Sequence, residues 1–116
     1  RTSLFIDADP AQVEAAARMG AAVVELHTGR YCAHSSESEL ARLRAAAAQA
    51  HALGLEVHAG HGIDYATVGA IAGIPEVVEL NIGHFLMGEA LFVGLPAAMK
   101  EMRRLMDGAR PLPTPN

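Results

Sequence analysis

The sequence contains one cysteine, Cys32, no tryptophan, and only 4% aromatic residues. A single cysteine can form neither an internal disulfide nor a zinc site built on cysteines, so we expect a reducing compartment. No apolar run reaches the roughly 18 residues that a membrane-spanning helix needs. The sequence therefore predicts a cytoplasmic protein with no membrane partner.

Basic residues are also scarce. Nine lysines and arginines stand against 13 aspartates and glutamates, which gives a formal net charge of −4. Proteins that bind nucleic acid along a broad surface need clustered lysine and arginine. We therefore expect no nucleic-acid partner, although a local pocket for a phosphate group remains compatible with this charge.

Hydrophobic residues make up 51% of the 116 positions, which is typical of a folded protein. This length suffices for one modest domain and excludes two. The chain starts at Arg1 and enters a strand-like run within a few residues. We expect it to be part of a longer polypeptide.

Strand-like runs alternate with helical stretches along residues 1–108. We expect four strands, near residues 3–7, 22–27, 55–59 and 77–82, with a helical segment after each. Capping patterns mark the helix starts, and glycines mark their ends: Asp9-Pro10-Ala11-Gln12 to Gly20, Ser36-Glu37-Ser38-Glu39 to Gly54, Asp64 to Gly73, and Gly83-His84 to Gly108 with a break near Gly94. Residues 109–116 are expected to form a proline-rich tail.

Four β-then-α units in strict order predict an α/β fold with a parallel sheet. Three strand ends share a pattern in which an acid and a His or Asn lie on one face and an aliphatic residue on the other. The triplets are Glu25-Leu26-His27, Glu56-Val57-His58 and Glu79-Leu80-Asn81. A polar inner face fits a (β/α)8 TIM barrel better than a flat sheet covered on both sides. Such barrels take about 250 residues, so four units are half of one. If the fourth strand is the last of the barrel, the chain supplies the last four β/α units.

Phosphate often binds TIM barrels at the loops after the seventh and eighth strands. In this sequence those loops carry Gly60-His61-Gly62 and Gly83-His84, and the second loop leads directly into a helix. Glycine lets backbone N–H groups approach an anion, and a helix N-terminus complements its charge. The alternative is that these glycines only form tight turns.

Two side chains are candidates for proton transfer or charge stabilisation. His61 lies in a loop at the expected barrel mouth, and histidine titrates in the range that general acid–base catalysis requires. Glu25 is expected on the inner face near the end of its strand, where a carboxylate must be paired, hydrated or catalytic. A structural pairing of Glu25 with a lysine or arginine from outside this chain is the alternative.

A metal site is a competing interpretation. Three imidazoles and a carboxylate can bind zinc, and the sequence offers four histidines near strand ends: His27, His58, His61 and His84. Their spacing matches no compact zinc motif, and we place His27, His58 and Asn81 in one layer below the loops. Cys32 has no neighbouring histidine in a nucleophile pattern, so we expect it to be passive.

Several separated motifs, in the correct order, resemble the carboxyl-terminal half of the pyridoxine 5′-phosphate synthase family. The resemblance covers nearly all of the chain before the proline-rich tail. The motifs are Ser3-Leu4-Phe5-Ile6-Asp7-Ala8-Asp9, Val24-Glu25-Leu26-His27-Thr28-Gly29, Gly54-Leu55-Glu56-Val57-His58-Ala59-Gly60-His61-Gly62, Glu79-Leu80-Asn81-Ile82-Gly83-His84 and Phe92-Val93-Gly94-Leu95. The family often has Asn where this chain has His58, and the segment around residues 30–38 varies in length.

The resemblance implies a (β/α)8 enzyme that condenses 3-amino-2-oxopropyl phosphate with 1-deoxy-D-xylulose 5-phosphate. The resemblance also implies that the enzyme uses no metal or organic cofactor. It further implies that the enzyme assembles as a homo-octamer. By position, Glu25 corresponds to a transition-state stabiliser and His61 to a proton donor, while Gly62, Gly83 and His84 correspond to contacts with aminooxopropyl phosphate. Further catalytic bases belong to the family's amino-terminal half.

Two other functions stay open from the residues alone. One is a metal-dependent TIM-barrel hydrolase, and the other is a non-catalytic half-barrel that binds a phosphorylated metabolite and self-associates.

Overall fold

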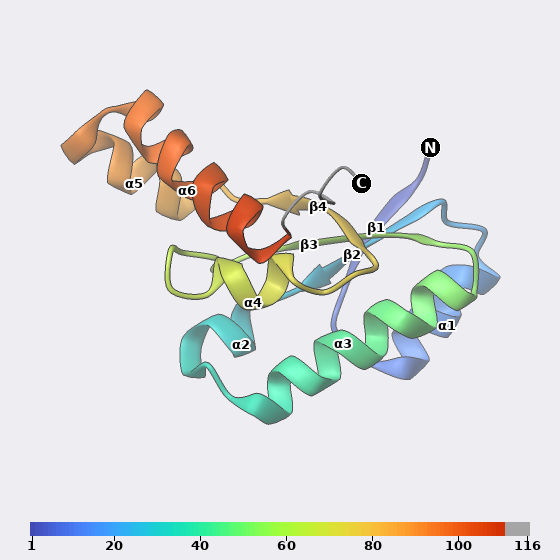
Figure 1. Ribbon diagram of the computed structural model, residues 1–116. Coiled ribbons are helices and arrows are strands. Elements are labelled where there is room, and N and C mark those ends of the chain that lie inside the picture. The colour runs from blue at the N-terminus through green and yellow to red at the C-terminus, as the bar shows by residue number, and fades with distance from the viewer. Residues whose placement is uncertain (111–116) are drawn as a thin grey trace, which may run out of the picture.

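Parallel strands alternate with helices throughout residues 1–110, the part of the chain that the computed structural model describes (Figure 1). The elements are β1 (Ser3–Ile6), α1 (Pro10–Arg18), β2 (Val23–His27), α2 (Gly29–His34), α3 (Glu37–Ala52), β3 (Glu56–Gly60), α4 (Val68–Ala72), β4 (Val77–Asn81), α5 (His84–Val93) and α6 (Leu95–Ala109). The strands form one sheet in the order β1-β2-β3-β4, with every neighbouring pair parallel. This α/β arrangement confirms the predicted β/α units of a partial TIM barrel.

One face of the sheet is aliphatic and carries the core. In the pairing register, Leu4, Val24, Val57 and Val77 form one layer of this face, and Ile6, Leu26, Ala59 and Leu80 form the next. Figure 1 shows α1, α3 and α4 on one side of the sheet. Buried helix residues such as Val13, Leu43 and Ile71 belong to the same cluster as the strand residues. Burial of this aliphatic surface is the main favourable contribution to the fold.

The opposite face is polar, as the strand-end triplets predict, but its layers differ from the expectation. Glu25 is level with His58 and Glu79, whereas His27 is level with Gly60 and Asn81. The prediction that His27, His58 and Asn81 share one layer is therefore wrong for His58, whereas His27 and Asn81 do share a layer. The physical reason is the stagger between strands, which a barrel sheet requires and which moves β3 by two residues relative to its neighbours.

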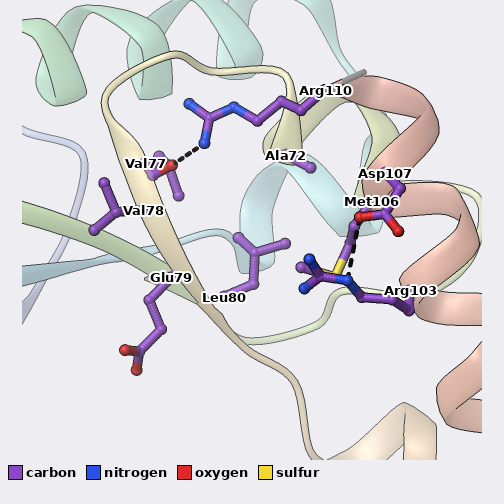
Figure 2. A pocket seen from close by; sticks show the side chains of 9 residues that line it. All are labelled: Ala72, Val77, Val78, Glu79, Leu80, Arg103, Met106, Asp107 and Arg110. Atoms are coloured by element: carbon purple, nitrogen blue, oxygen red, sulfur yellow. Dashed lines mark hydrogen bonds and ion pairs between the residues drawn. The ribbon is translucent and has the colours of Figure 1, made fainter. Parts of the chain in front are cut away.

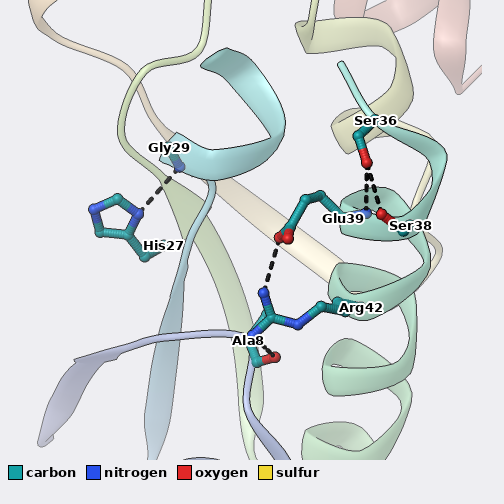
Figure 3. A network of polar contacts seen from close by, with 7 residues as sticks. All are labelled: Ala8, His27, Gly29, Ser36, Ser38, Glu39 and Arg42. Atoms are coloured by element: carbon teal, nitrogen blue, oxygen red, sulfur yellow. Dashed lines mark hydrogen bonds and ion pairs between the residues drawn. The ribbon is translucent and has the colours of Figure 1, made fainter. Parts of the chain in front are cut away.

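One half of the predicted capping box of α3 is confirmed, namely the hydrogen bond to the N-cap side chain. Ser36 is the N-cap, and its hydroxyl accepts a hydrogen bond from the Glu39 N–H at 3.3 Å. The Glu39 carboxylate pairs with Arg42 at 2.9 Å, and Arg42 also donates to the Ala8 carbonyl at 3.1 Å (Figure 3). This network ties the start of α3 to the loop after β1.

Other helix ends agree less closely with the prediction, and α4 begins at Val68 after the N-cap Thr67 instead of directly after Asp64. Asp9 is the N-cap of α1, but its side chain makes no capping hydrogen bond, and Gln12 Oε1 instead accepts from the Asp7 N–H at 2.9 Å. Asp64 Oδ1 accepts from the Thr67 N–H at 2.9 Å, so it organises a turn before α4 begins. The predicted break at Gly94 is confirmed, with φ of 86° between α5 and α6.

Arg110 fastens the end of α6 to the loop that enters β4. Its guanidinium donates to the Val77 carbonyl at 2.7 Å (Figure 2). It also donates to the Ile74 carbonyl at 2.9 Å and to the Pro75 carbonyl. A cavity of about 560 Å³ lies between α6 and β4, the last strand of the described sheet.

Most of the predicted tail, residues 111–116, lies outside the described residues. No helix within residues 1–110 is long and apolar enough to cross a membrane.

Candidate functional site

A cavity of about 460 Å³ opens where the strands end at their carboxyl termini. Its lining comes from β1, β2, the loop after β3, the end of β4, the loop after β4 and the start of α5. All five residues singled out in the sequence lie on its wall: Glu25, His61, Gly62, Gly83 and His84. Carboxyl ends of parallel strands meet at one edge of a sheet, so residues that are up to 59 positions apart in sequence share one site. Their chemical roles stay predictions.

The Glu25 carboxylate is held by an amide. Asn81 Nδ2 donates to Glu25 Oε1 at 2.7 Å. The other carboxylate oxygen lies over Gly60, where an added Cβ would stand only 2.5 Å from Glu25 Oε2. Within residues 1–110 this hydrogen bond joins Glu25 to a neutral group, and the alternative of a lysine or arginine from outside this chain stays open.

His61 has an unusual backbone. Its φ is 86°, in the left-handed region that residues with a Cβ rarely adopt. The buried hydroxyl of Thr28 stabilises this loop, lying 2.8 Å from the Gly60 carbonyl oxygen and 2.6 Å from the His61 carbonyl oxygen. Backbone strain of this kind is concentrated at functional sites, because it persists only where the surroundings enforce it.

The imidazole of His27 stacks on that of His61, with ring centroids 4.5 Å apart. The Gly29 N–H donates to His27 Nδ1 at 3.1 Å, so neutral His27 carries its proton on Nε2 (Figure 3). A Cβ at Gly29 would stand 2.5 Å from His27 Cε1 and 3.0 Å from His61 Cδ2. Gly29 thus gives both rings the space in which they stack.

The loop after β4 places backbone donors at the cavity. Gly83 is the N-cap of α5, and His84 is its first residue. The first amides of an α-helix have no partner within the helix, and the helix dipole makes this end positive. A Cβ at Gly83 would meet no atom within 4 Å, so the open space beside it can admit a ligand. Gly62, with φ of 78°, completes the wall from the neighbouring loop.

The four histidines of the metal alternative do not converge. Within residues 1–110, no group of three His, Cys, Asp or Glu side chains is placed to hold a metal ion. His58 is buried and pairs with Glu56, with 2.6 Å between His58 Nε2 and Glu56 Oε2. Hydrogen bonds from His58 and then Arg1 lower the pKa of the Glu56 carboxyl. Glu56 is therefore engaged in a pair of its own, away from the cavity.

Cys32 is half-buried beside the loop after β3. Its Sγ lies 3.5 Å from Thr67 Oγ1, and burial raises the pKa of the thiol. A raised pKa keeps the thiol protonated, and only the thiolate is an effective nucleophile. This agrees with a passive role for Cys32.

The sequence missed three residues that shape the site. Asn81 and Thr28 make the hydrogen bonds described above, and Gly60 leaves space for the Glu25 carboxylate. The sequence does carry one signal for Asn81, because the strand-end triplet Glu79-Leu80-Asn81 ends in asparagine whereas the other two triplets end in histidine. The short helix α2 was also missed, since its residues show no amphipathic repeat long enough to detect.

Comparisons with known proteins agree on one family. The family model described as "Pyridoxal phosphate biosynthesis protein PdxJ" matches residues 1–108. A relative from Caulobacter sp. strain K31, named "Pyridoxine 5'-phosphate synthase", is 63% identical over 117 aligned residues, which cover 95% of this chain and 47% of the relative. Relatives of the same name from Caulobacter vibrioides and Roseobacter denitrificans are 61% and 62% identical over 95% of this chain, and 46% and 47% of their own lengths are covered. The chain spans about half the length of the curated relatives that it matches.

Proposed function

Because this chain belongs to the family of the pyridoxal phosphate biosynthesis protein PdxJ, we propose that it forms the carboxyl-terminal half of an active pyridoxine 5′-phosphate synthase. The reaction condenses 3-amino-2-oxopropyl phosphate with 1-deoxy-D-xylulose 5-phosphate and gives pyridoxine 5′-phosphate, phosphate and water. One observation carries the proposal: all five candidate residues line one cavity of about 460 Å³. That volume is in the range of pockets for small metabolites.

His61 is the proposed proton donor. A ring-forming condensation loses water in several steps, and a hydroxyl group leaves as water only when it receives a proton. The imidazole of His61 lines the cavity and is held by stacking on His27 and by the Thr28 hydroxyl behind its backbone. A fixed donor raises the rate because its orientation is established before the reaction begins.

Glu25 is the proposed stabiliser of positive charge that develops in the transition state. Its carboxylate lines the cavity and is bound by a neutral amide, which places no positive charge beside it. Fixed charges aimed at the reacting atoms are among the largest contributions to catalysis.

Gly62, Gly83 and His84 are the proposed contacts to the phosphate group of aminooxopropyl phosphate. The N-terminus of α5 supplies N–H donors and a positive dipole end, and the glycines let the phosphate oxygens come close to the backbone. A phosphate held here supplies binding energy away from the carbon atoms that react.

The rest of the proposed enzyme follows the resemblance. Residues 1–108 would form four of the eight β/α units. The other four units would belong to the amino-terminal half of a polypeptide as long as the relatives. That half would pair with the open sheet and supply the remaining catalytic bases. We propose a cytoplasmic homo-octamer that needs no metal or organic cofactor. Exposed apolar side chains at the junction of α5 and α6 support self-association, with Leu91 87% and Phe92 88% exposed.

Replacing Gly83 by valine tests the phosphate site. The experiment uses the full-length enzyme, by which we mean a polypeptide of the relatives' length that contains these residues. We expect the affinity of the Gly83→Val variant for inorganic phosphate to be lower by roughly 10- to 100-fold, because hydrogen bonds to a charged group are lost. Isothermal titration calorimetry measures this affinity. The fold is expected to persist, since a Cβ at position 83 meets no atom within 4 Å.

The matched control is Gly88→Val. Gly88 lies in the same helix, and its added Cβ also meets no atom within 4 Å. We expect this variant to bind phosphate as the unmodified enzyme does. Unchanged phosphate affinity in Gly83→Val, or an equal loss in both variants, would contradict the proposed site.

A further inference from the structure

The hydrogen bond between Asn81 and Glu25 joins two strands that are not neighbours. Glu25 lies in β2 and Asn81 in β4, and β3 lies between them in the sheet. Asn81 is level with Gly60 in the pairing register. Because Gly60 has no side chain, the amide and the carboxylate meet above the middle strand.

The orientation of the Asn81 amide follows from its partner. An ionised carboxylate can only accept hydrogen bonds, so the Nδ2 group of Asn81 must face it, and Oδ1 must point elsewhere. The distance of 2.7 Å is typical of a hydrogen bond to a charged acceptor. One carboxylate oxygen is thereby fixed, and the rotation of the Glu25 side chain is restricted.

The chemical type of this partner is significant. A lysine or arginine at position 81 would also fix the carboxylate, but it would neutralise the charge that the cavity presents. An amide fixes the position of the carboxylate and leaves its charge intact. This is the property that a stabiliser of developing positive charge requires.

We propose that Asn81 is a positioning residue that holds the Glu25 carboxylate in its reactive orientation across Gly60. The inference rests on the proposed function, in which Glu25 acts on the transition state. Asn81 acts through Glu25, so its removal lowers kcat and leaves the binding of aminooxopropyl phosphate unchanged.

The test is a double-mutant cycle in the full-length enzyme, with Asn81→Ala, Glu25→Gln and the two combined. Asn81→Ala is expected to lower kcat by roughly 10- to 100-fold, which corresponds to one hydrogen bond to a charged group, with KM for aminooxopropyl phosphate unchanged. In the Glu25→Gln background, the same substitution is expected to cause no further loss, because residues that act through one group are not additive. Asn81→Asp, which keeps the side-chain size and removes the donor, is expected to lose at least as much activity as Asn81→Ala.

The outcomes separate the inference from the proposed function. Full turnover in Glu25→Gln would contradict the role of Glu25 itself. A loss in Glu25→Gln with full turnover in Asn81→Ala and Asn81→Asp would overturn the positioning role alone. The positioning role would also be overturned if Asn81→Ala lowered kcat by the same factor in both backgrounds. It would likewise be overturned if both Asn81 variants failed to fold, as measured by circular dichroism. Each of these results indicates a role of Asn81 that is independent of Glu25.

Discussion

Replacing His61 by asparagine in the full-length enzyme is expected to lower kcat by roughly 100- to 10,000-fold, the usual contribution of a positioned general acid. Asparagine cannot deliver a proton near neutral pH. It tolerates the left-handed backbone better than most residues, so it suits the φ of 86° at this position and the loop should persist. KM for aminooxopropyl phosphate should change little, because the phosphate contacts lie on other residues. Steady-state kinetics measures both constants.

His51→Asn is the matched control for this prediction. His51 is exposed near the end of α3 and does not line the cavity. We expect its kcat to equal that of the unmodified enzyme. If His61→Asn kept full turnover, the assignment of His61 as proton donor would be wrong.

Replacing Gly60 by alanine is expected to have the second largest effect. The new Cβ would stand 2.5 Å from Glu25 Oε2 and 2.9 Å from the Asn81 carbonyl oxygen, so the carboxylate and part of the backbone must move. A displacement of about 1 Å in a catalytic group costs roughly 100-fold in rate, and overpacking costs about 1–3 kcal/mol of stability. Steady-state kinetics and urea unfolding measure the two effects.

Gly69→Ala provides the comparison for this substitution. Gly69 lies in α4, its φ is not positive, and an added Cβ meets no atom within 4 Å. Here alanine is expected to leave kcat unchanged and to raise stability by about 0.4–1 kcal/mol through the unfolded state. Equal kinetics in Gly60→Ala and Gly69→Ala would show that the space above Gly60 has no bearing on catalysis.

Much of the fold is predictable because its signals are local. Alternating aliphatic residues locate the four strands, and Ser36 and Gly94 mark helix boundaries by their capping and backbone properties. The strict β/α order then gives a parallel sheet, since right-handed crossovers leave few other arrangements. The same order brings Glu25, His61 and Gly83 to one edge of the sheet.

The details that the sequence did not reveal depend on register. In the pairing register, His58 lies beside Glu25 and not beside His27. This position follows from the stagger of β3, which no local sequence pattern encodes. The contact of Asn81 with Glu25 requires this register and also the missing side chain at Gly60. Thr28 looked like an ordinary residue after a strand, and its role as a buried hydroxyl behind His61 appears only when the two loops are side by side.

The most direct test of the proposed function is product formation by the full-length enzyme, supplied with aminooxopropyl phosphate and deoxyxylulose phosphate and followed by mass spectrometry. We predict that pyridoxine 5′-phosphate and inorganic phosphate appear in equal amounts, and that a metal chelator leaves the rate unchanged. Absence of pyridoxine 5′-phosphate from a folded enzyme that still binds inorganic phosphate would contradict the synthase and favour a non-catalytic phosphate-binding protein. Loss of activity with the chelator would contradict the metal-free mechanism.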